Sequence, residues 1–153
     1  MKIGDFVQGG ILFYSGATFQ LISAQQDIII PLYWGVYGTA VSGTSTEIGS
    51  GSNNTNLISH IFANSGYSML AANVCSGYSF SGYTDWFLPS KDELNEIYLL
   101  KTIIGGFDIY TNYWSSSQYT PECAWMQYFA TGMQSGLGYK DQLYKVRPIR
   151  IYT

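Results

Sequence analysis

His60 is the only histidine in the chain, so histidine chemistry is limited from the start. A histidine triad for zinc, or a three-histidine iron site, cannot be assembled from a single histidine. A serine-type triad would need His60 beside a nucleophile, and no Gly-x-Ser-x-Gly turn precedes a helix in this sequence. We therefore expect His60 to lie on a helix surface rather than to act as a ligand or base.

The other nucleophiles are serines and cysteines. Ser115, Ser116 and Ser117 follow a tryptophan, and we expect their hydroxyls to bond to backbone groups in a turn. Cys75 and Cys123 are too few for a disulfide framework, and they form either one disulfide or two buried thiols. We favour the thiols, because free cysteine is among the most buried residue types. No nucleophile pairs with a base, and we predict a domain without catalytic activity.

Four carboxylates lie close together in the sequence: Asp85, Asp92, Glu93 and Glu96. Ser90 is a good helix N-cap, and Glu93 three residues later completes a capping box. Negative charge in a first helical turn also suits the helix dipole, so a structural role is the better interpretation. Calcium needs several converging oxygens, and the 10 acidic residues contain no Asp-x-Asp cluster. We predict no metal and no cofactor, with calcium held by scattered oxygens as the open alternative.

Composition excludes several partner classes. Charged residues make up only 11% of the chain and the net charge is −3, while 46% of residues are hydrophobic and 17% aromatic. The only cluster of cations is Lys145, Arg147 and Arg150, which is too small to follow phosphates or an acidic lipid surface. A surface built from Tyr, Ser, Thr and Asn is instead typical of binding loops. We predict no nucleic-acid partner.

The length of 153 residues fits one domain, which we place at residues 1–153. No apolar run approaches the roughly 20 residues that span a membrane. The first residues, Met1–Asp5, lack the charged and apolar regions of a signal peptide. Either the protein is not exported by that route or the signal has been removed, and phage lysis is a third way to reach the outside.

The N-terminal half predicts a hairpin, a long loop and a helix. Ile11–Tyr14 and Phe19–Ile22 are apolar runs separated by a turn signal, and Ile28–Ile30 is a third short β-branched run. From Gly35 to Asn56 no apolar period occurs, which indicates a surface loop. Apolar residues then recur at helical spacing from Leu57, after a cap at Asn53 or Asn54, and a second helical run ends before Gly77.

The C-terminal half predicts one helix and several strands. The capping box starts a helix from Lys91 to about Lys101. Tyr113–Ser116 and Ala124–Phe129 favour short strands, and a glycine-rich stretch follows from Gly132 to Gly138. Tyr144–Tyr152 is an alternating final strand, in which Pro148 requires a sheet edge or a bulge.

Helix and strands together predict a core and one buried ion pair. Seven apolar residues should be buried together: Trp86, Leu88, Leu94, Ile97, Trp114, Trp125 and Val146. The Ile11–Tyr14 strand should lie beside Val146–Ile151, which brings the termini together and closes the sheet. Arg147 should be partly buried with Asp85 as its partner, or Glu93 as the alternative, because a lightly charged protein must pair the charges it buries.

The block Gly82–Leu94 (GYTDWFLPSKDEL) resembles the Lcl C-terminal-domain-like family, whose relatives include the Fibrobacter-type major paralogous domain. Further segments continue the resemblance over essentially the whole chain: Gly9–Tyr14, Trp34–Thr39, Tyr113–Ser117, Ala124–Trp125 and Lys145–Arg150. The resemblance implies an α+β, C-type-lectin-like fold, with two helices packed on a small twisted antiparallel sheet and long loops. It also implies adhesion or ligand display rather than catalysis. A formylglycine-generating-type enzyme shares the fold class and would need two reactive cysteines brought together.

These observations predict a ligand-recognition or display domain. The leading interpretation is a phage virion surface protein, such as a fibre tip, receptor-binding or decoration protein, made in the host cytoplasm without a signal peptide. A bacterial surface adhesin domain is the alternative, and the formylglycine-generating-type enzyme is the second alternative. Expected partners are a host-surface glycan or protein, or other virion proteins, without insertion into a membrane. A homo-oligomer is compatible with this interpretation, and a fibre tip would be a trimer.

The region from Tyr119 to Leu143 is the predicted binding surface. It has little apolar period and much glycine, and a residue mixture unlike a core occupies every second position. On an extended segment that spacing sends side chains to one face. The candidate ligand-binding residues are Tyr119, Tyr128, Met133, Ser135, Leu137, Tyr139, Asp141 and Leu143. The Gly43–Asn54 loop is the alternative site.

Overall fold

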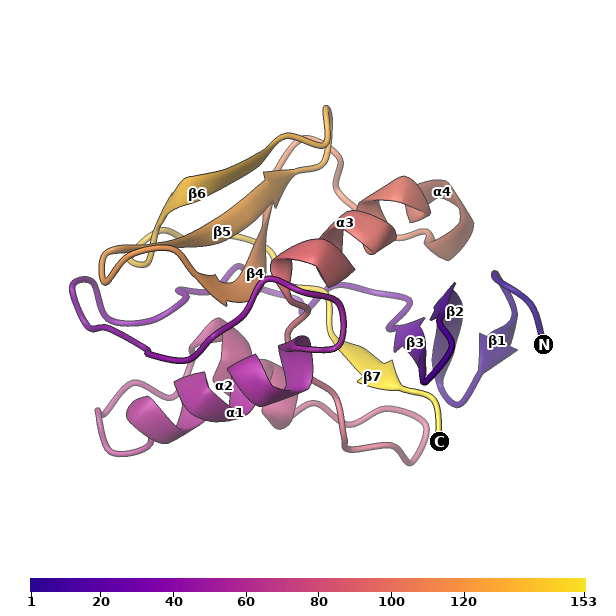
Figure 1. Ribbon diagram of the computed structural model, residues 1–153, viewed down its shortest axis with the longest axis horizontal. Helices are drawn as coiled ribbons and strands as arrows, with labels where there is room; N and C mark the ends of the chain where they lie inside the picture. The colour runs from indigo at the N-terminus through magenta and orange to yellow at the C-terminus, as the bar shows by residue number, and fades with distance from the viewer.

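The N-terminal hairpin organises the first of two antiparallel sheets in the computed structural model, which describes residues 1–153 (Figure 1). β1 (Phe6–Val7), β2 (Gly10–Ser15) and β3 (Gln20–Ser23) follow one another, and β7 (Ile149–Ile151) completes the order β1-β2-β3-β7. The predicted hairpin is confirmed. The predicted pairing of the last strand with Ile11–Tyr14 is wrong, because β1 and β3 already occupy both edges of β2 and β7 pairs with β3 instead.

The two termini lie at the same end of the molecule, as predicted (Figure 1). The Gln8 side chain bonds to both the backbone N–H and the carbonyl oxygen of Thr153. The sheet is not closed, since β1 and β7 are its two edges. The final strand is also shorter than predicted. Pro148, which lacks an N–H donor, stands directly before β7 begins, at the sheet edge.

The second sheet has the order β4-β5-β6 and lies at the other side of the molecule (Figure 1). β4 (Asn112–Gln118) and β5 (Cys123–Tyr128) match the predicted strands, and the glycine-rich stretch forms β6 (Gln134–Tyr139). A Cβ atom at Gly138 would lie 2.6 Å from the Trp114 ring. Glycine at this position therefore lets the backbone of β6 approach the buried tryptophan closely.

Four helices accompany the sheets: α1 (Gly51–Ile61), α2 (Ala71–Ser76), α3 (Lys91–Leu99) and α4 (Lys101–Ile104). The capping box of α3 is confirmed, with the Glu93 N–H donating to Ser90 Oγ and the Ser90 N–H donating to Glu93 Oε2. α1 begins earlier than predicted, without a side-chain cap from Asn53 or Asn54. The buried Glu93 carboxylate reaches across from α3 and accepts the Gly51 N–H, so one acidic residue serves the starts of both helices.

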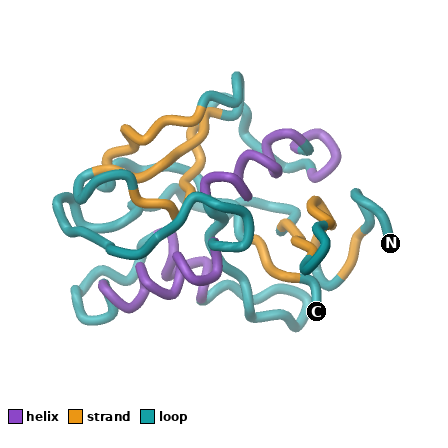
Figure 2. The backbone as a smooth tube through the Cα atoms, in the orientation of Figure 1, coloured by secondary structure: helices purple, strands orange, loops and turns teal.

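The class is therefore α+β, with two sheets and four helices in place of the predicted two helices on one sheet. α3 contacts strands of both sheets. The predicted run Ile28–Ile30 is not a strand, and the Ile29 side chain is 97% exposed. The predicted loop is confirmed up to Ser50, and Figure 2 shows how much of the chain between β3 and α1 is loop.

The apolar core divides into two clusters. Leu88, Trp114 and Val146 belong to the first, which packs between α1, α2 and the second sheet, whereas Leu94 and Ile97 belong to the second, around β2, β3 and Phe129. Six of the seven predicted core residues are buried: Trp86, Leu88, Leu94, Ile97, Trp114 and Val146. The prediction that all seven residues share one cluster is wrong, because the apolar stripe of α3, Leu94 and Ile97, packs against the first sheet. Trp125 is only half-buried, on the side of β5 where the Lys91 ammonium lies 4.8 Å from its ring.

Arg147 is fully buried, but its partner is Asp27 rather than Asp85 or Glu93. Its Nε donates to Asp27 Oδ1 at 2.9 Å. Asp85 instead holds Arg150, with Nε to Oδ1 at 2.6 Å and Nη2 to Oδ2 at 2.9 Å. That ion pair lowers the pKa of Asp85, the side-chain hydrogen bond from Arg150 being the largest cause. The chain therefore buries two guanidinium groups and gives each its own carboxylate.

Candidate ligand-binding groove

The histidine and the serines, which have catalytic potential, lie in different environments. His60 is exposed near the end of α1, as predicted. The serines of β4 are fully buried and hydrogen-bonded, for example Ser115 Oγ to the Trp125 carbonyl at 2.7 Å and Ser117 Oγ to the Ser45 carbonyl at 2.8 Å. The predicted bonding to backbone groups is thus confirmed for Ser115 and Ser117, but Ser116 Oγ accepts from the Asn54 side chain, and the three serines lie in a strand rather than in the predicted turn.

Both cysteines are free and buried, in agreement with the favoured interpretation. Cys75 is part of the apolar cluster beside α1, and burial raises the pKa of its thiol far above the ordinary value. A thiol is nucleophilic only as the thiolate, so Cys75 is unreactive at neutral pH.

No group of three or more histidine, cysteine, aspartate or glutamate side chains is arranged to hold a metal ion. None of the helices combines the length and the apolar character that crossing a bilayer requires.

The predicted binding residues are mostly at the surface. Tyr119, Met133, Leu137, Tyr139 and Leu143 each expose about half of their area or more, Leu137 the most at 64%. Asp141 is exposed as well, whereas Tyr128 and Ser135 are partly buried.

The structure does not gather these residues on one face. In β6, Ser135 pairs with Met126 and Tyr139 pairs with Cys123. Because Cys123 and Met126 are three positions apart in β5, their side chains point to opposite sides of the sheet, and so do those of their partners Tyr139 and Ser135. One extra residue in β6 between the two pairs breaks the alternation, as in a β-bulge. The prediction of a single alternating face is therefore wrong.

The predicted set also divides along the hairpin. Tyr128 and Met133 lie at the turn between β5 and β6. Tyr139, Asp141 and Leu143 lie at or beyond the opposite end of β6, a strand of six residues and thus roughly 20 Å long.

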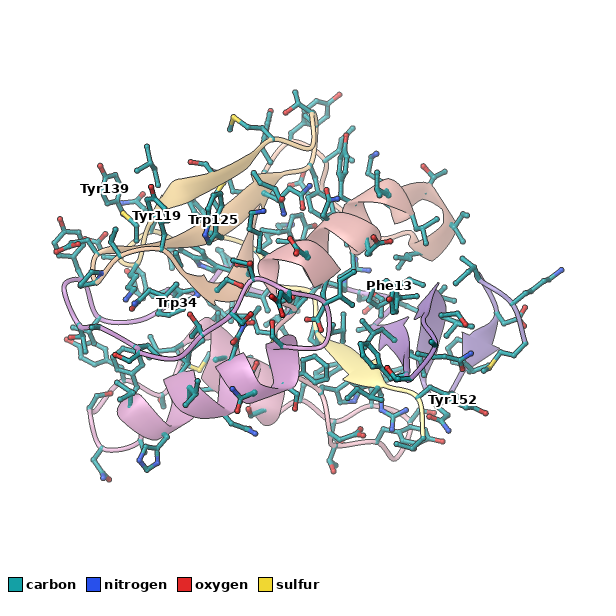
Figure 3. The ribbon with its side chains drawn as sticks, viewed as in Figure 1. Phe13, Trp34, Tyr119, Trp125, Tyr139 and Tyr152 are labelled. Carbon is teal, nitrogen blue, oxygen red and sulfur yellow. The ribbon has the colours of Figure 1, made fainter.

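Tyr119 is exposed but held in place. Its ring meets the Trp125 ring edge-on, with centroids 5.3 Å apart. The Tyr119 ring also packs closely on the backbone of Gly136, where a Cβ atom would lie 2.6 Å from the Tyr119 ring. Figure 3 shows Tyr119 between Trp125 and Tyr139, at the end of the second sheet that lies away from the termini. Two aromatic residues at this end are thus fixed on the sheet.

A groove of about 500 Å³ opens beside Tyr139. We call it the tyrosine groove, and it is lined by Tyr33, Gly35, Val36, Tyr37, Tyr67, Leu70 and Asp141. The Tyr37 ring packs against the Tyr139 ring at a centroid distance of 6.4 Å, which connects the groove to the predicted surface. Of the predicted residues, Asp141 lines the groove and Tyr139 flanks it.

The chain segment that lines the groove is anchored by buried side chains. Trp34, between the lining residues Tyr33 and Gly35, is fully buried and donates from Nε1 to the Ser115 carbonyl at 2.7 Å. The buried Lys140 ammonium lies 4.6 Å from the Trp34 ring and donates to the Thr39 carbonyl at 2.8 Å and to Gln118 Oε1 at 2.7 Å. Burial lowers the pKa of Lys140 to about 8. Lys140 therefore fixes the loop that carries Tyr37.

No family model matches the chain, and no curated protein matches it. Among solved structures it is similar to the crystal structure of a fimbrial protein from Bacteroides ovatus ATCC 8483. The two share a fold with a TM-score of 0.58 at 16% sequence identity. The match covers 85% of this chain and 35% of that chain, so the present chain corresponds to about a third of the fimbrial protein.

Sequence reasoning missed the three tyrosines that line the groove. Tyr37 lies in the loop without an apolar period, Tyr33 lies two residues before that loop, and Tyr67 lies in the connection between α1 and α2. The available signal was chemical rather than periodic: large aromatic residues in loops of a lightly charged chain are often contact residues. The fold is needed to show that these separate loops meet.

Proposed function

We propose that this domain recognises a ligand through the tyrosine groove and is displayed at a surface. The observation that carries the proposal is the groove itself, in which three partly exposed tyrosines and one carboxylate surround about 500 Å³. Tyrosine offers a large, rigid, amphipathic contact area at low entropic cost. A concave, largely apolar site with a few polar groups is the common form of a ligand site.

A role without catalysis fits the side chains that chemistry would need. The Cys75 thiol is buried with a raised pKa, and Cys123 is also buried, which argues against the formylglycine-generating-type alternative. The β4 serines are occupied by structural hydrogen bonds.

The fimbrial neighbour favours a bacterial surface over the virion surface as the setting of this domain. We also propose that the fold is C-type-lectin-like and that the chain is related to the Lcl C-terminal-domain-like family. The support is the hairpin β2–β3 joined to β7 near both termini, the two longer helices α1 and α3, and the separate sheet β4-β5-β6 beside a long loop.

Binding of the purified chain to a panel of bacterial cells and to a glycan array tests the proposal. Replacing Tyr37 and Tyr67 together by Ala should lower binding at least about tenfold, since aromatic anchors usually carry more than 1 kcal/mol each. A second variant, with Tyr119, Leu137 and Tyr139 replaced by Ser, asks whether the contact extends onto the second sheet.

The matched control replaces two exposed tyrosines that do not line the groove, Tyr110 and Tyr152. It should bind like the original protein. If the groove variant is folded and binds as strongly as this control, the proposal is wrong.

A further inference from the structure

The tyrosine groove continues into a second hollow of about 250 Å³. Tyr33, Tyr67 and Leu70 line both parts, so a ligand in one reaches the other without leaving the surface. The second part is completed by Gly66, Ser68 and Met69. The side chains that line the two parts differ in charge and polarity, and this difference restricts the class of ligand that the groove can bind.

Asp141 is the only charged residue that lines either part. Its carboxylate forms none of the ion pairs of the protein, which join Lys91 to Asp92, Lys145 to Asp27 and Asp108, Arg147 to Asp27, and Arg150 to Asp85. The neighbouring Lys140 is fully buried, and its ammonium donates to the Thr39 carbonyl and Gln118 instead. The first part of the groove therefore presents a negative charge that lacks a cation.

The tyrosine rings add to this preference. Aromatic faces attract cations, and a cation near a carboxylate and a ring gains from both. The protein already uses the same chemistry internally, with Lys101 4.1 Å from the Tyr98 ring and Arg150 4.1 Å from the Tyr83 ring. An anionic ligand would face the Asp141 carboxylate with no positive side chain in the lining to offset it.

The second part is apolar. Met69 and Tyr67 are each more than half exposed there, and apart from Ser68 and the tyrosine hydroxyls no side chain offers a hydrogen bond. Covering these residues with an apolar group is favourable, at about 25 cal/mol per Å² of apolar surface removed from water. Sugar hydroxyls placed against Met69 and the face of the Tyr67 ring would lose water without gaining partners.

We infer that the groove binds an extended peptide segment of a partner protein, with a lysine or arginine beside Asp141 and an apolar side chain over Met69 and the Tyr67 ring. This inference rests on the proposed function and names the chemistry of its ligand. A peptide places a cationic and an apolar side chain a few residues apart, which is the combination that the two parts favour.

The test titrates the full chain, observed by NMR, with short acetylated and amidated peptides. Three peptides each contain one lysine and one leucine, which are adjacent in the first and separated by one or two glycines in the others. In the matched control peptides, glutamine replaces the lysine or serine replaces the leucine. The best lysine–leucine peptide should shift groove resonances saturably. Each replacement should weaken its binding at least about fivefold, which corresponds to about 1 kcal/mol.

Charge recognition is tested with Asp141→Asn. This variant should bind the lysine and glutamine peptides equally, while Asp5→Asn, the same charge change near the N-terminus, should keep the preference for lysine. The inference is overturned if no lysine–leucine peptide binds, if Asp141→Asn keeps the preference, or if chitotriose binds the groove and the peptides do not.

The cell-binding experiment separates this inference from the proposed function. If replacing Tyr37 and Tyr67 abolishes binding to cells and Asp141→Asn leaves it intact, the groove is the site but its ligand is not cationic. If neither change affects binding, the proposed function itself fails.

Discussion

The buried Arg147 gives the sharpest prediction about stability. Its guanidinium donates to Asp27 and to three carbonyl oxygens, those of Ala24 at 2.9 Å, Gly105 at 3.0 Å and Gly106 at 2.8 Å. Burial lowers the pKa of Arg147, but arginine still remains charged at every practical pH. Asp27→Asn keeps the size of the side chain and removes the negative charge opposite Arg147.

The expected loss is large because the charge stays behind. Removing one partner of a buried ion pair costs about 3–5 kcal/mol. The Asp27 side chain is 11% exposed, and an asparagine oxygen still accepts one hydrogen bond, so we expect the lower end, about 3 kcal/mol. For a domain of this length that corresponds to a melting temperature lower by about 6–12 °C.

Urea unfolding of the single and double variants measures the coupling between the two residues. Asp27→Asn combined with Arg147→Gln should cost at least about 1 kcal/mol less than the sum of the two single changes. As the matched comparison, Asp85→Asn combined with Arg147→Gln should be additive, because Asp85 binds Arg150. A loss below about 1 kcal/mol for Asp27→Asn, or additivity with Arg147→Gln, would refute the reasoning.

Three further predictions follow from buried contacts. Trp114→Ala empties a fully buried site and should lower the free energy of unfolding by about 3–5 kcal/mol in urea titrations, and a normal melting temperature would contradict this. The pKa of Lys140 is about 8 when folded against an ordinary value of 10.5, so the unfolded chain holds more protons between these pH values. The stability of the protein relative to Lys140→Gln should therefore rise between pH 8 and 10.5, by up to about 3 kcal/mol, and a difference that is constant with pH would refute it. A Cβ atom at Gly51 would lie 2.2 Å from Glu93 Oε2, so Gly51→Ala should destabilise by about 1–3 kcal/mol in thermal melts, whereas Gly77→Ala, with 3.5 Å to the nearest atom, should not.

Local features of the fold could be predicted from the sequence. The β2–β3 hairpin and the strands β4 and β5 followed from short apolar runs bounded by turn residues. The capping box of α3 followed from the spacing of Ser90 and Glu93. In each case the signal lies within a few residues, so no distant contact was needed to see it.

What failed depended on contacts between distant segments. Ile28–Ile30 has strand propensity, but no neighbouring strand pairs with it, and propensity without a partner does not make a strand. Sparse charge predicted that Arg147 would be buried, but Asp27 and Asp85 are chemically equivalent candidates that only the path of the chain distinguishes. The groove has the same origin, since Tyr33 and Tyr67 are brought together from separate loops.

The position of the termini has a mechanical consequence. Gln8 holds Thr153 at one end of the long axis, where Figure 3 places Tyr152, and Tyr139 beside the groove lies at the other end. Tension applied between the two termini enters and leaves the domain at one place, and it loads the edge strands of the first sheet, β1 against β2 and β7 against β3. Tension between a ligand in the groove and either terminus also loads one of these edge strands, and it then crosses the whole length of the molecule, through both sheets. Pulling on the two ends therefore leaves the second sheet and the groove unloaded, whereas pulling on the ligand loads the entire domain.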